Sequence, residues 1–376
     1  MDVLTLEGLA SLLSTLRSQG FTLIGPTLRD GAIVLDEISS SDDLPHGWRE
    51  EQAPGAYSLE KRSDDALFGY VVSQHSWKRF LYPPRTCLFK ATKSGKAFEV
   101  QPSNGASHAP YAFIGVRSCD LHAMGLLDKV FRNGEYPDPG YVERRANAFI
   151  VAVQCTEPAG TCFCSSMNTG PRATGGFDIA LTELIDGGDH LFLAEGGTER
   201  GRFLLASLSA RPAGPDDVRK AEGLFEQAGR TFSRQMPPGD KSPLVGEYFD
   251  HGRWDDIAKR CLSCANCTMV CPTCFCSTVE ETTDLTGTRA ERWRRWDSCF
   301  TTDFTRVAGG NIRMSTRTRY RQWITHKLVH WVDQFGEPGC VGCGRCITWC
   351  PAHIDITAEA AAFIEPTVIS TNTQGG

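Results

Sequence analysis

Two stretches of the sequence decide how the second half of the chain folds: RCLSCANCTMVCP at residues 260–272 and CVGCGRCITWCP at residues 340–351. In both, cysteines recur with gaps of two, two and three residues, and a proline follows the last cysteine. This spacing is typical of paired [4Fe-4S] clusters, in which three thiolates wrap one cluster and the fourth ligates the other. The pattern therefore predicts two clusters that share ligands across the two stretches. Cluster 1 takes Cys261, Cys264, Cys267 and Cys350, and cluster 2 takes Cys340, Cys343, Cys346 and Cys271.

A zinc ribbon is the alternative for cysteines that occur in such pairs. It closes two pairs around one tetrahedral ion, whereas this chain has two sets of four cysteines with a proline after each set. We expect Gly342 and Gly344 to let the backbone come close to the cluster sulfides, where a Cβ would crowd. The segment between the two runs, residues 272–339, is longer than a small ferredoxin needs, and we predict that it is an insert with a fold of its own.

The composition of the whole chain is that of a soluble globular protein. Its 376 residues favour two domains, and 41% of them are hydrophobic and 22% charged. The formal net charge of -6 argues against nucleic-acid binding, which usually needs a basic surface. We see no signal peptide and no membrane span, so we expect a cytoplasmic protein. Sixteen cysteines in such a protein indicate metal or redox chemistry rather than disulfides.

The first 240 residues alternate short strand-like runs with helical patterns. Leucines recur on one helical face within residues 1–20, and helices are also predicted at 121–131 and 216–232. Strand-like runs lie at 21–24, 32–35, 67–72, 113–116, 149–153, 177–181, 191–193 and 203–206. This alternation predicts an α/β domain with a partly parallel sheet over residues 1–240. The Pro/Gly-rich run 237–243 marks its end, and residues 241–376 are predicted to form a mainly α, ferredoxin-like domain with two clusters.

Four further cysteines are expected to meet at one edge of that sheet. Cys119 follows the strand at 113–116 and begins a helix, and Cys155 follows the next strand. A right-handed strand–helix–strand unit brings both to the same carboxyl edge, and the loop after Cys155 carries Cys162 and Cys164. A helix N-terminus also favours a thiolate at Cys119. We predict a third [4Fe-4S] cluster here; the alternative is a set of buried, reduced thiols.

The motif TCFCS of residues 161–165 recurs at 273–277, where its cysteines are Cys274 and Cys276. Cys299 is the expected companion of this second pair, and the complete ligand set of such an extra site stays open. Cys87 has no partner in the sequence, and we expect no role for it. We also find no nucleotide-binding motif, catalytic triad or substrate pocket, so the sequence leaves open whether the chain is an enzyme by itself.

Some polar residues have two interpretations. Basic residues without acidic neighbours run from 304 to 332, which suits either a solvated helix or a strip that offsets cluster charge. This basic strip consists of Arg306, Arg313, Arg317, Arg319, Arg321 and Lys327. His353 is expected to tune a neighbouring cluster by hydrogen bonding rather than to ligate it. His75, Trp77 and Lys78 form a polar and aromatic patch that packing explains as well as a site does.

With these residues in view, the chain resembles the family that contains the β subunit of cytoplasmic [NiFe] sulfhydrogenases and the corresponding iron–sulfur subunit of anaerobic sulfite reductases. The matching stretches are LFGYVVSQHSWKRFLYPP (67–84), GVRSCDLHA (115–123), CTEPAGTCFCSSMNTGP (155–171), RCLSCANCTMVCPTCFC (260–276), WDSCF (296–300) and CVGCGRCITWCP (340–351). They span most of the chain and are specific in combination.

The resemblance implies an electron-transfer subunit that relays single electrons between a flavin-containing, NAD(P)H-reacting subunit and a catalytic subunit. The catalytic partner it implies is a hydrogenase or, as the alternative, a sulfite reductase. Reasoning from the residues alone leaves two further classes of function open: a thiol or iron–sulfur redox sensor, and a zinc-stabilised interaction module. A coloured, iron-containing protein distinguishes the cluster proteins from the zinc module.

Overall fold

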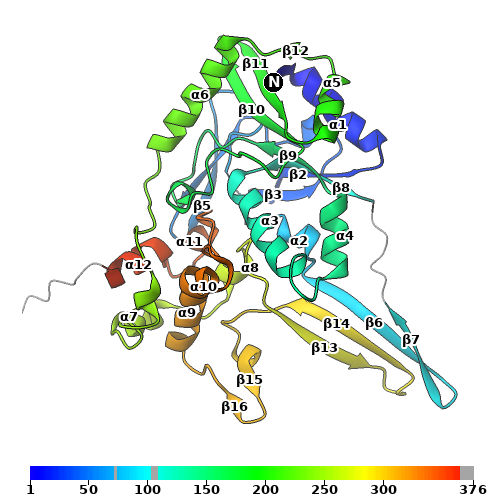
Figure 1. Cartoon of the computed structure of the whole chain (residues 1–376), viewed down its shortest axis with the longest axis vertical. Coiled ribbons are helices and arrows are strands. Elements are labelled where there is room, and N and C mark those ends of the chain that lie inside the picture. Colours follow the sequence, from blue (N-terminus) through cyan, green and yellow to red (C-terminus); the bar gives the residue numbers. More distant parts are fainter. Residues whose placement is uncertain (72–73, 103–108, 365–376) are drawn as a thin grey trace, which may run out of the picture.

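The N-terminal half of the molecule is built around one large β-sheet (Figure 1). The computed structural model describes residues 1–71, 74–102 and 109–364. Within these residues the sheet has eight strands in the order β12-β1-β11-β10-β9-β8-β2-β3. Strands β2, β8, β9 and β10 pair in parallel, and the outer strands pair antiparallel. The strands are β1 (Asp2–Thr5), β2 (Thr22–Arg29), β3 (Ala32–Glu37), β8 (Tyr111–Val116), β9 (Phe149–Val153), β10 (Ile179–Asp186), β11 (Asp189–Gly196) and β12 (Arg211–Pro212).

Helices cover both faces of this sheet, because its strands alternate their side chains between two apolar cores. Ile114 and Val151 belong to the core under α1 and α5, whereas Phe113 and Ile150 belong to the core under α2, α3 and α4. Helix α6 packs against β10 and β11 near the other end of the sheet. The helices are α1 (Leu6–Ser18), α2 (Lys78–Leu81), α3 (Ser118–Phe131), α4 (Pro139–Asn147), α5 (Glu199–Ala206) and α6 (Pro215–Arg230).

The predicted α/β organisation of this half is confirmed. The predicted helices correspond to α1, α3 and α6, and the strand–helix–strand unit of 113–153 is β8–α3–α4–β9 with its two strands parallel. Cys119 therefore lies in the first turn of α3 just beyond β8, and Cys155 lies just beyond β9. Both thiols follow carboxyl ends of neighbouring parallel strands, as the sequence predicts.

Two strand predictions are wrong. Residues 203–206 end helix α5, whose cap Thr198 accepts a hydrogen bond from the backbone N–H of Gly201. Gly201 allows α5 to lie on the sheet, since a Cβ there would come within 1.8 Å of the Asp178 carbonyl oxygen. Residues 67–71 form no strand, because the N–H groups of Leu67 and Phe68 donate to the carboxylate of Glu183 instead of to a neighbouring strand. Residue 72 of that predicted run lies outside the described residues.

A second sheet projects from the body as a long arm (Figure 1). It combines the early strands β6 (Arg85–Ser94) and β7 (Ala97–Pro102) with the late strands β13 (Ser277–Thr283) and β14 (Arg289–Trp296). The order is β13-β14-β6-β7, so β14 pairs with a strand almost two hundred residues earlier in the chain. The domain boundary near residue 240 stays a prediction, and this sheet joins strands from both sides of it.

Beyond residue 240 the chain contains both helices and strands. The helices are α7 (Arg253–Arg260), α8 (Asn266–Met269), α9 (Thr316–Thr325), a π-helical segment (His326–His330), α10 (Trp331–Phe335), α11 (Arg345–Thr348) and α12 (Ile356–Ile364).

The remaining small elements are spread over both halves of the chain. Strands β4 (Trp48–Ala53) and β5 (Ala56–Lys61) form one hairpin, and β15 (Arg306–Val307) and β16 (Gly310–Asn311) form another. Short 3₁₀ turns occur at Ser41–Asp43, Cys164–Met167, Ser242–Leu244 and Thr302–Thr305.

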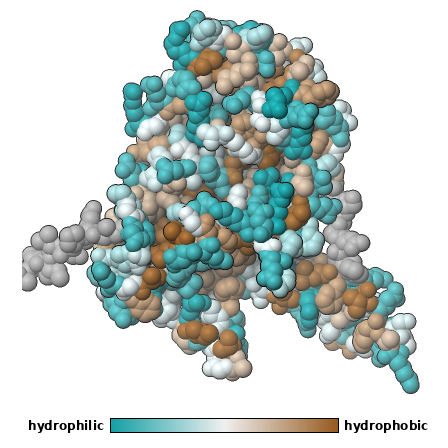
Figure 2. Space-filling view, in the orientation of Figure 1, coloured by the Kyte–Doolittle hydropathy of each residue, from teal (hydrophilic) through white to brown (hydrophobic). Residues whose placement is uncertain are grey.

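Hydrophobic side chains reach the surface on the two lower projections of the molecule, the β15–β16 hairpin and the four-stranded arm (Figure 2). Ile312 and Met314 beside the hairpin are 67% and 69% exposed, and Phe98 and Val100 on the arm are 55% and 57% exposed. Exposed apolar groups that lie together are typical of surfaces that contact other proteins. Of the helices in the described ranges, none has the length and apolar composition to cross a membrane.

Candidate iron–sulfur site

The two cysteine loops have the same backbone conformation. In the first, α7 ends at Arg260, just before Cys261, and Ser263 and Ala265 on either side of Cys264 have positive φ angles of 51° and 68°. In the second, Gly342 and Gly344 stand on either side of Cys343 and have φ angles of 64° and 76°. Each loop then enters one helical turn, α8 or α11, and ends at the cysteine before proline. The repeated spacing of the sequence thus produces a repeated three-dimensional loop.

The glycines of the second loop allow a close approach of another part of the polypeptide. A Cβ on Gly342 would come within 2.7 Å of the backbone of Cys164, and one on Gly344 within 2.5 Å of the Thr161 carbonyl oxygen. The segment that comes close to both glycines is therefore residues 161–164. The first loop carries Ser263 and Ala265 at the matching positions, although the left-handed conformation favours glycine there too.

The four cysteines predicted for cluster 1 line one cavity. Its volume is about 420 Å³, and Cys350 of the second run joins Cys261, Cys264 and Cys267 of the first. The apolar wall consists of Leu262, Phe300, Tyr320, Trp323 and Ile354, among others. Backbone N–H groups donate to two of the sulfurs, from Ser263 to Cys261 at 3.5 Å and from Ile354 to Cys350 at 3.4 Å.

The four cysteines predicted for cluster 2 line a second cavity of about 330 Å³. Here Cys271 of the first run joins Cys340, Cys343 and Cys346 of the second. Cys346 and the indole of Trp323 line both cavities, so the two lie next to each other. The structure thus brings each predicted quartet together, with one cysteine exchanged between the runs, and ligation of iron by these thiols stays a prediction.

The donors around these cavities suit an iron–sulfur cluster. Thiolate sulfur is the ligand type that such clusters use. Burial raises the pKa of Cys267 and Cys346 well above the usual value, so these thiols are neutral unless a metal binds them. The hydroxyl of Tyr320 and the indole N–H of Trp323 are buried and have no hydrogen-bond partner among the described residues, and both residues line the first cavity. Two donors without acceptors in a cysteine-lined cavity fit a group that presents sulfur as acceptor.

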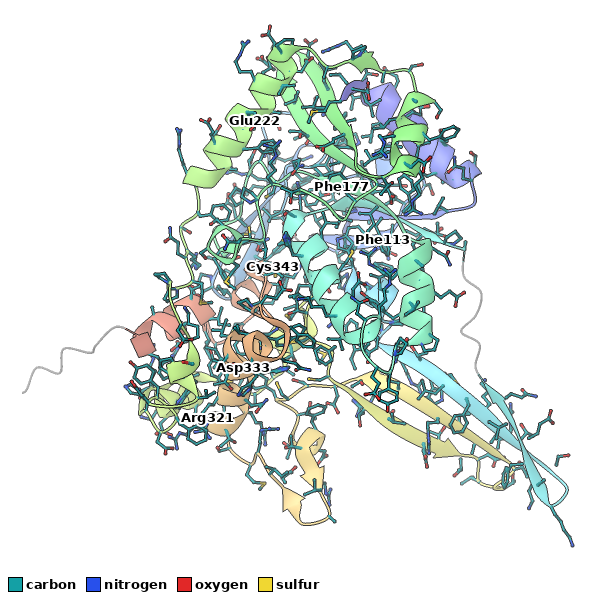
Figure 3. The ribbon with its side chains drawn as sticks, in the orientation of Figure 1. Phe113, Phe177, Glu222, Arg321, Asp333 and Cys343 are labelled. Carbon is teal, nitrogen blue, oxygen red and sulfur yellow. The ribbon has the colours of Figure 1, made fainter. Side chains whose placement is uncertain are left out.

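The four cysteines predicted for a third cluster are all buried beside the second cavity. Cys119, Cys162 and Cys164 belong to one packed cluster together with Cys343. Figure 3 labels Cys343. Cys155 lies close enough to raise the pKa of both Cys162 and Cys164, although burial is the largest cause of each shift. Burial and the neighbouring Asp120 raise the pKa of Cys119 well above its usual value, which opposes the effect of the helix N-terminus on this thiol.

The loop that carries Cys162 and Cys164 is held against the second cysteine loop by hydrogen bonds. The N–H of Phe163 donates to the Gly342 carbonyl at 2.8 Å, and the hydroxyl of Thr169 donates to the Val341 carbonyl at 2.6 Å. The hydroxyl of Thr161 lies 2.8 Å from that of Thr348 in α11. The third set of cysteines is therefore adjacent to the second cavity.

The remaining cysteines fall into two groups. Cys274 lies beside Cys271, and Cys276 and Cys299 lie close to one another. Within the described residues, no three cysteine, histidine or acidic side chains are arranged to hold a single metal ion. Cys87 is buried in β6, where its thiol lies 3.6 Å from the Phe89 carbonyl oxygen.

Two lysines lie beside Cys271: Lys327 of the basic strip and Lys78 of the polar and aromatic patch. The ammonium of Lys327 is 3.2 Å from the Cys271 sulfur, and that of Lys78 donates to the carbonyls of Cys271 and Cys274 at 3.0 and 2.8 Å. Burial lowers the pKa of Lys78 to about 8. Burial opposes the charge of Lys327 as well, but Cys271 and Cys274 outweigh it and hold the Lys327 pKa well above its usual value. The only available signal was a lysine within the apolar helical segment that includes Ile324, Leu328 and Trp331.

A buried ion pair also went unpredicted. Arg345, between two cysteines of the second run, makes a bidentate salt bridge to Asp120 in α3 at 2.8 and 2.9 Å. Their side chains are 1% and 3% exposed. The pair links the helix that begins at Cys119 to the loop that carries Cys343.

The residues of the basic strip, and His353, do not share one environment. Of the strip, Lys327 and Arg319 are buried, Arg317 pairs with Asp250 and Asp255 on the surface, and the guanidinium of Arg319 donates to backbone carbonyls. These side chains form no single surface. A ring nitrogen of His353 lies 2.6 Å from the Pro54 carbonyl oxygen.

Comparison with known proteins agrees with this geometry. The family model described as a 4Fe-4S dicluster domain matches residues 260–354. The chain is 36% identical over 295 residues to sulfhydrogenase 2 subunit beta of Pyrococcus furiosus, and the match covers 78% of this chain and 84% of that protein. The chain belongs to the sulfhydrogenase β-subunit family. The predicted resemblance is thereby confirmed on its sulfhydrogenase branch, and no solved structure matches the chain significantly.

This sulfhydrogenase β-type protein is an iron–sulfur, electron-transfer subunit of the hydrogenase type. The dicluster match covers both cysteine runs and the insert between them, in which β13, β14 and the β15–β16 hairpin lie. The residues that surround the first two cavities thus belong to the part of the chain for which [4Fe-4S] clusters are supported.

Proposed function

We propose that this chain holds three [4Fe-4S] clusters in a row and passes single electrons along them. A [4Fe-4S] cluster supplies a one-electron redox couple when it is bound. The observation that carries the proposal is that each site shares or contacts residues of the next one. Cys346 and Trp323 line both the first and the second cavity, and Cys343 of the second cavity packs with Cys119, Cys162 and Cys164.

The ligands follow from these positions. Cluster 1 is held by Cys261, Cys264, Cys267 and Cys350; cluster 2 by Cys340, Cys343, Cys346 and Cys271; and cluster 3 by Cys119, Cys155, Cys162 and Cys164. The second cluster occupies the middle of the row. The protein contributes thiolate ligands, donors to their sulfurs and an apolar wall that excludes water, all of which tune a cluster's potential.

The first cluster is the one that faces a partner. Cys264 is exposed, and Leu262 beside it is 67% exposed, whereas the cysteines of the third set are buried. We propose that the neighbours are a flavin-containing, NAD(P)H-reacting subunit and a hydrogenase catalytic subunit, in the cytoplasm. A sulfite reductase catalytic subunit is the alternative. The apolar groups on the arm and on the β15–β16 hairpin support contact with such subunits.

The domain organisation belongs to the same proposal. Residues 241–376 act as a mainly α, ferredoxin-like two-cluster domain, with residues 272–339 as an insert, and residues 1–240 supply the third cluster. The matched loops around Cys264 and Cys343 support a paired origin of the two cluster motifs.

Iron quantitation and low-temperature EPR on anaerobically purified full-length chain test the number of clusters. Three cubanes give about twelve irons per chain, and replacement of the ligand Cys264 with Ser should change one EPR signal while Cys87→Ser changes none. A wild-type value of about eight irons would remove the third cluster. Fewer than about eight would overturn the relay itself.

A further inference from the structure

Two buried lysines meet at one side of the second cavity. Lys78 begins α2, and Lys327 lies in the π-helical segment between α9 and α10, so they come from distant parts of the chain. Each is 4% exposed. A π-helical turn inside a longer helix often accompanies a functional site, and here it carries the lysine that reaches Cys271.

Each ammonium is held by several contacts around the Cys271–Cys274 segment. Lys327 contacts the Cys271 sulfur at 3.2 Å, the Thr273 hydroxyl at 2.9 Å and the Gly339 carbonyl at 3.2 Å. Lys78 contacts the carbonyls of Cys271 and Cys274, and its ammonium lies 3.9 Å from the centre of the Trp296 ring. These contacts fix both positive charges in place.

No carboxylate balances these charges. The partners of the two ammoniums are carbonyl oxygens, one hydroxyl and one sulfur, and in the described part of the chain neither ammonium forms an ion pair with an acidic side chain. A buried charge is costly unless an opposite charge compensates it. The group that supplies negative charge here is the thiolate-ligated cluster 2 of the proposed function.

The first site lacks this arrangement. No lysine, arginine or histidine is among the described residues that line the first cavity, and the sulfurs of Cys261 and Cys350 receive bonds from neutral backbone N–H groups. Beside the third set, Arg345 is balanced by Asp120, and the buried guanidinium of Arg117 donates to backbone carbonyls, among them that of Gln154 next to Cys155. Cluster 2 therefore differs from cluster 1 in the uncompensated positive charge beside it.

We propose that Lys327 and Lys78 are the counter-ions of cluster 2 and give it a reduction potential above that of cluster 1. Reduction adds one electron, and hence one negative charge, to a cluster that is already anionic. Nearby positive charge and hydrogen bonds to the ligand sulfur stabilise the reduced form more than the oxidised form. This inference rests on the proposed function, because it needs clusters 1 and 2 to be present.

Redox titration followed by EPR on the full-length chain measures the effect. Lys327→Met removes the charge and the N–H···S bond with little change in volume, and Lys78→Met removes a charge that contacts only carbonyls and a ring. We expect Lys327→Met to lower the reduced-to-oxidised ratio of one signal at least tenfold at a fixed poise, which is about 59 mV for a one-electron couple. Lys78→Met should move the same signal in the same direction by less.

The control is Lys259→Met, which makes the same substitution on α7 beside the first loop, where the lysine side chain is 77% exposed. It should leave every potential unchanged. Cys264→Ser identifies the signal of cluster 1, so the signal that moves in Lys327→Met must be a different one. Lys327→Gln keeps a hydrogen-bond donor without the charge, and it should give an intermediate shift.

The results separate the inference from the proposed function. If Lys327→Met loses the second cluster, Lys78→Met and Lys327→Gln still report the shift. Full iron content with no shift in any of the three lysine variants, or a shift confined to the cluster 1 signal, overturns the inference. A wild-type chain with fewer than about eight irons overturns the proposed function instead, whatever the variants do.

Discussion

The buried ion pair between Asp120 and Arg345 allows a quantitative prediction about the contact between the large sheet's helix α3 and the second cysteine loop. The two side chains form a bidentate pair at 2.8 and 2.9 Å and are 3% and 1% exposed. Asp120→Asn preserves the shape of the side chain but leaves the guanidinium buried without that counter-charge. Removing one partner of a buried pair costs about 3–5 kcal/mol. Since 1 kcal/mol shifts Tm by roughly 2–4 °C in domains of about 150–250 residues, we expect Tm to fall by roughly 6–20 °C.

The assay is a double-mutant cycle on the full-length chain. Thermal unfolding is followed by far-ultraviolet circular dichroism, anaerobically and at one scan rate, for wild type, Asp120→Asn, Arg345→Met and the double variant. Each single variant leaves one member of the pair alone, whereas the double variant leaves neither. The double variant should therefore lose about 2–3 kcal/mol less free energy of unfolding than the two single variants lose when their effects are added. Iron content measured on each sample separates this effect from loss of a cluster.

The matched control is Asp36→Asn, which breaks a pair between Asp36 and Arg29 on the surface. Those side chains are 35% and 60% exposed, and exposed pairs contribute about 0–1 kcal/mol. If Asp120→Asn melts as closely to wild type as this control does, or if the double variant equals the sum of the single variants, the pair does not hold the two parts together and the reasoning fails.

Two other predictions concern backbone space and pH. Gly344→Ala should lower the iron content, because the new Cβ would overlap the loop packed on Gly344 and because the φ of this residue is +76°. The control is Ala265→Gly at the matching position of the first loop, which should not lower the iron content. Equal iron contents of the two variants in a colorimetric assay would contradict this prediction. Burial raises the pKa of Glu50 in the folded protein to about 7 from 4.5. As the pH rises, the Glu50 carboxyl therefore loses its proton in the unfolded chain before it does so in the folded protein. The contribution of Glu50 to the free energy of unfolding falls by about 3 kcal/mol between about pH 4.5 and 7. Glu50→Gln cannot titrate and should show a flatter dependence of Tm on pH between about pH 5 and 7; parallel curves would show that Glu50 does not titrate in this range.

Much of the site could be predicted because its signals are short and local. The spacing of each cysteine run fixes a loop, and the two loops indeed have left-handed residues at the same positions around Cys264 and Cys343. The parallel pair β8 and β9 could also be predicted, since apolar strands on both sides of a helical pattern favour a crossover unit. From that unit follows the position of Cys119 and Cys155 just beyond neighbouring parallel strands.

The strands of the arm were missed for an equally physical reason. In strands β6 and β7, Lys90, Lys93, Glu99 and Gln101 interrupt the apolar residues, because much of the arm is solvated and needs no continuous hydrophobic run. Residues 203–206 of helix α5 were predicted as a strand because they are four consecutive apolar residues. In both cases the surroundings, rather than the local pattern, decide the conformation.

The sequence by itself determined the chemistry of this protein: which cysteines form quartets, that two of the quartets exchange a cysteine, and that a third set follows the carboxyl ends of parallel strands. These features depend on spacings within a few tens of residues. Only the tertiary structure decided how the sites relate to one another. The packing of residues 161–164 on Gly342 and Gly344, the pairing of β6 with β14, and the meeting of Lys78 with Lys327 join segments that are distant in the chain. No periodicity connects such segments, because their contact depends on the path of the whole backbone between them.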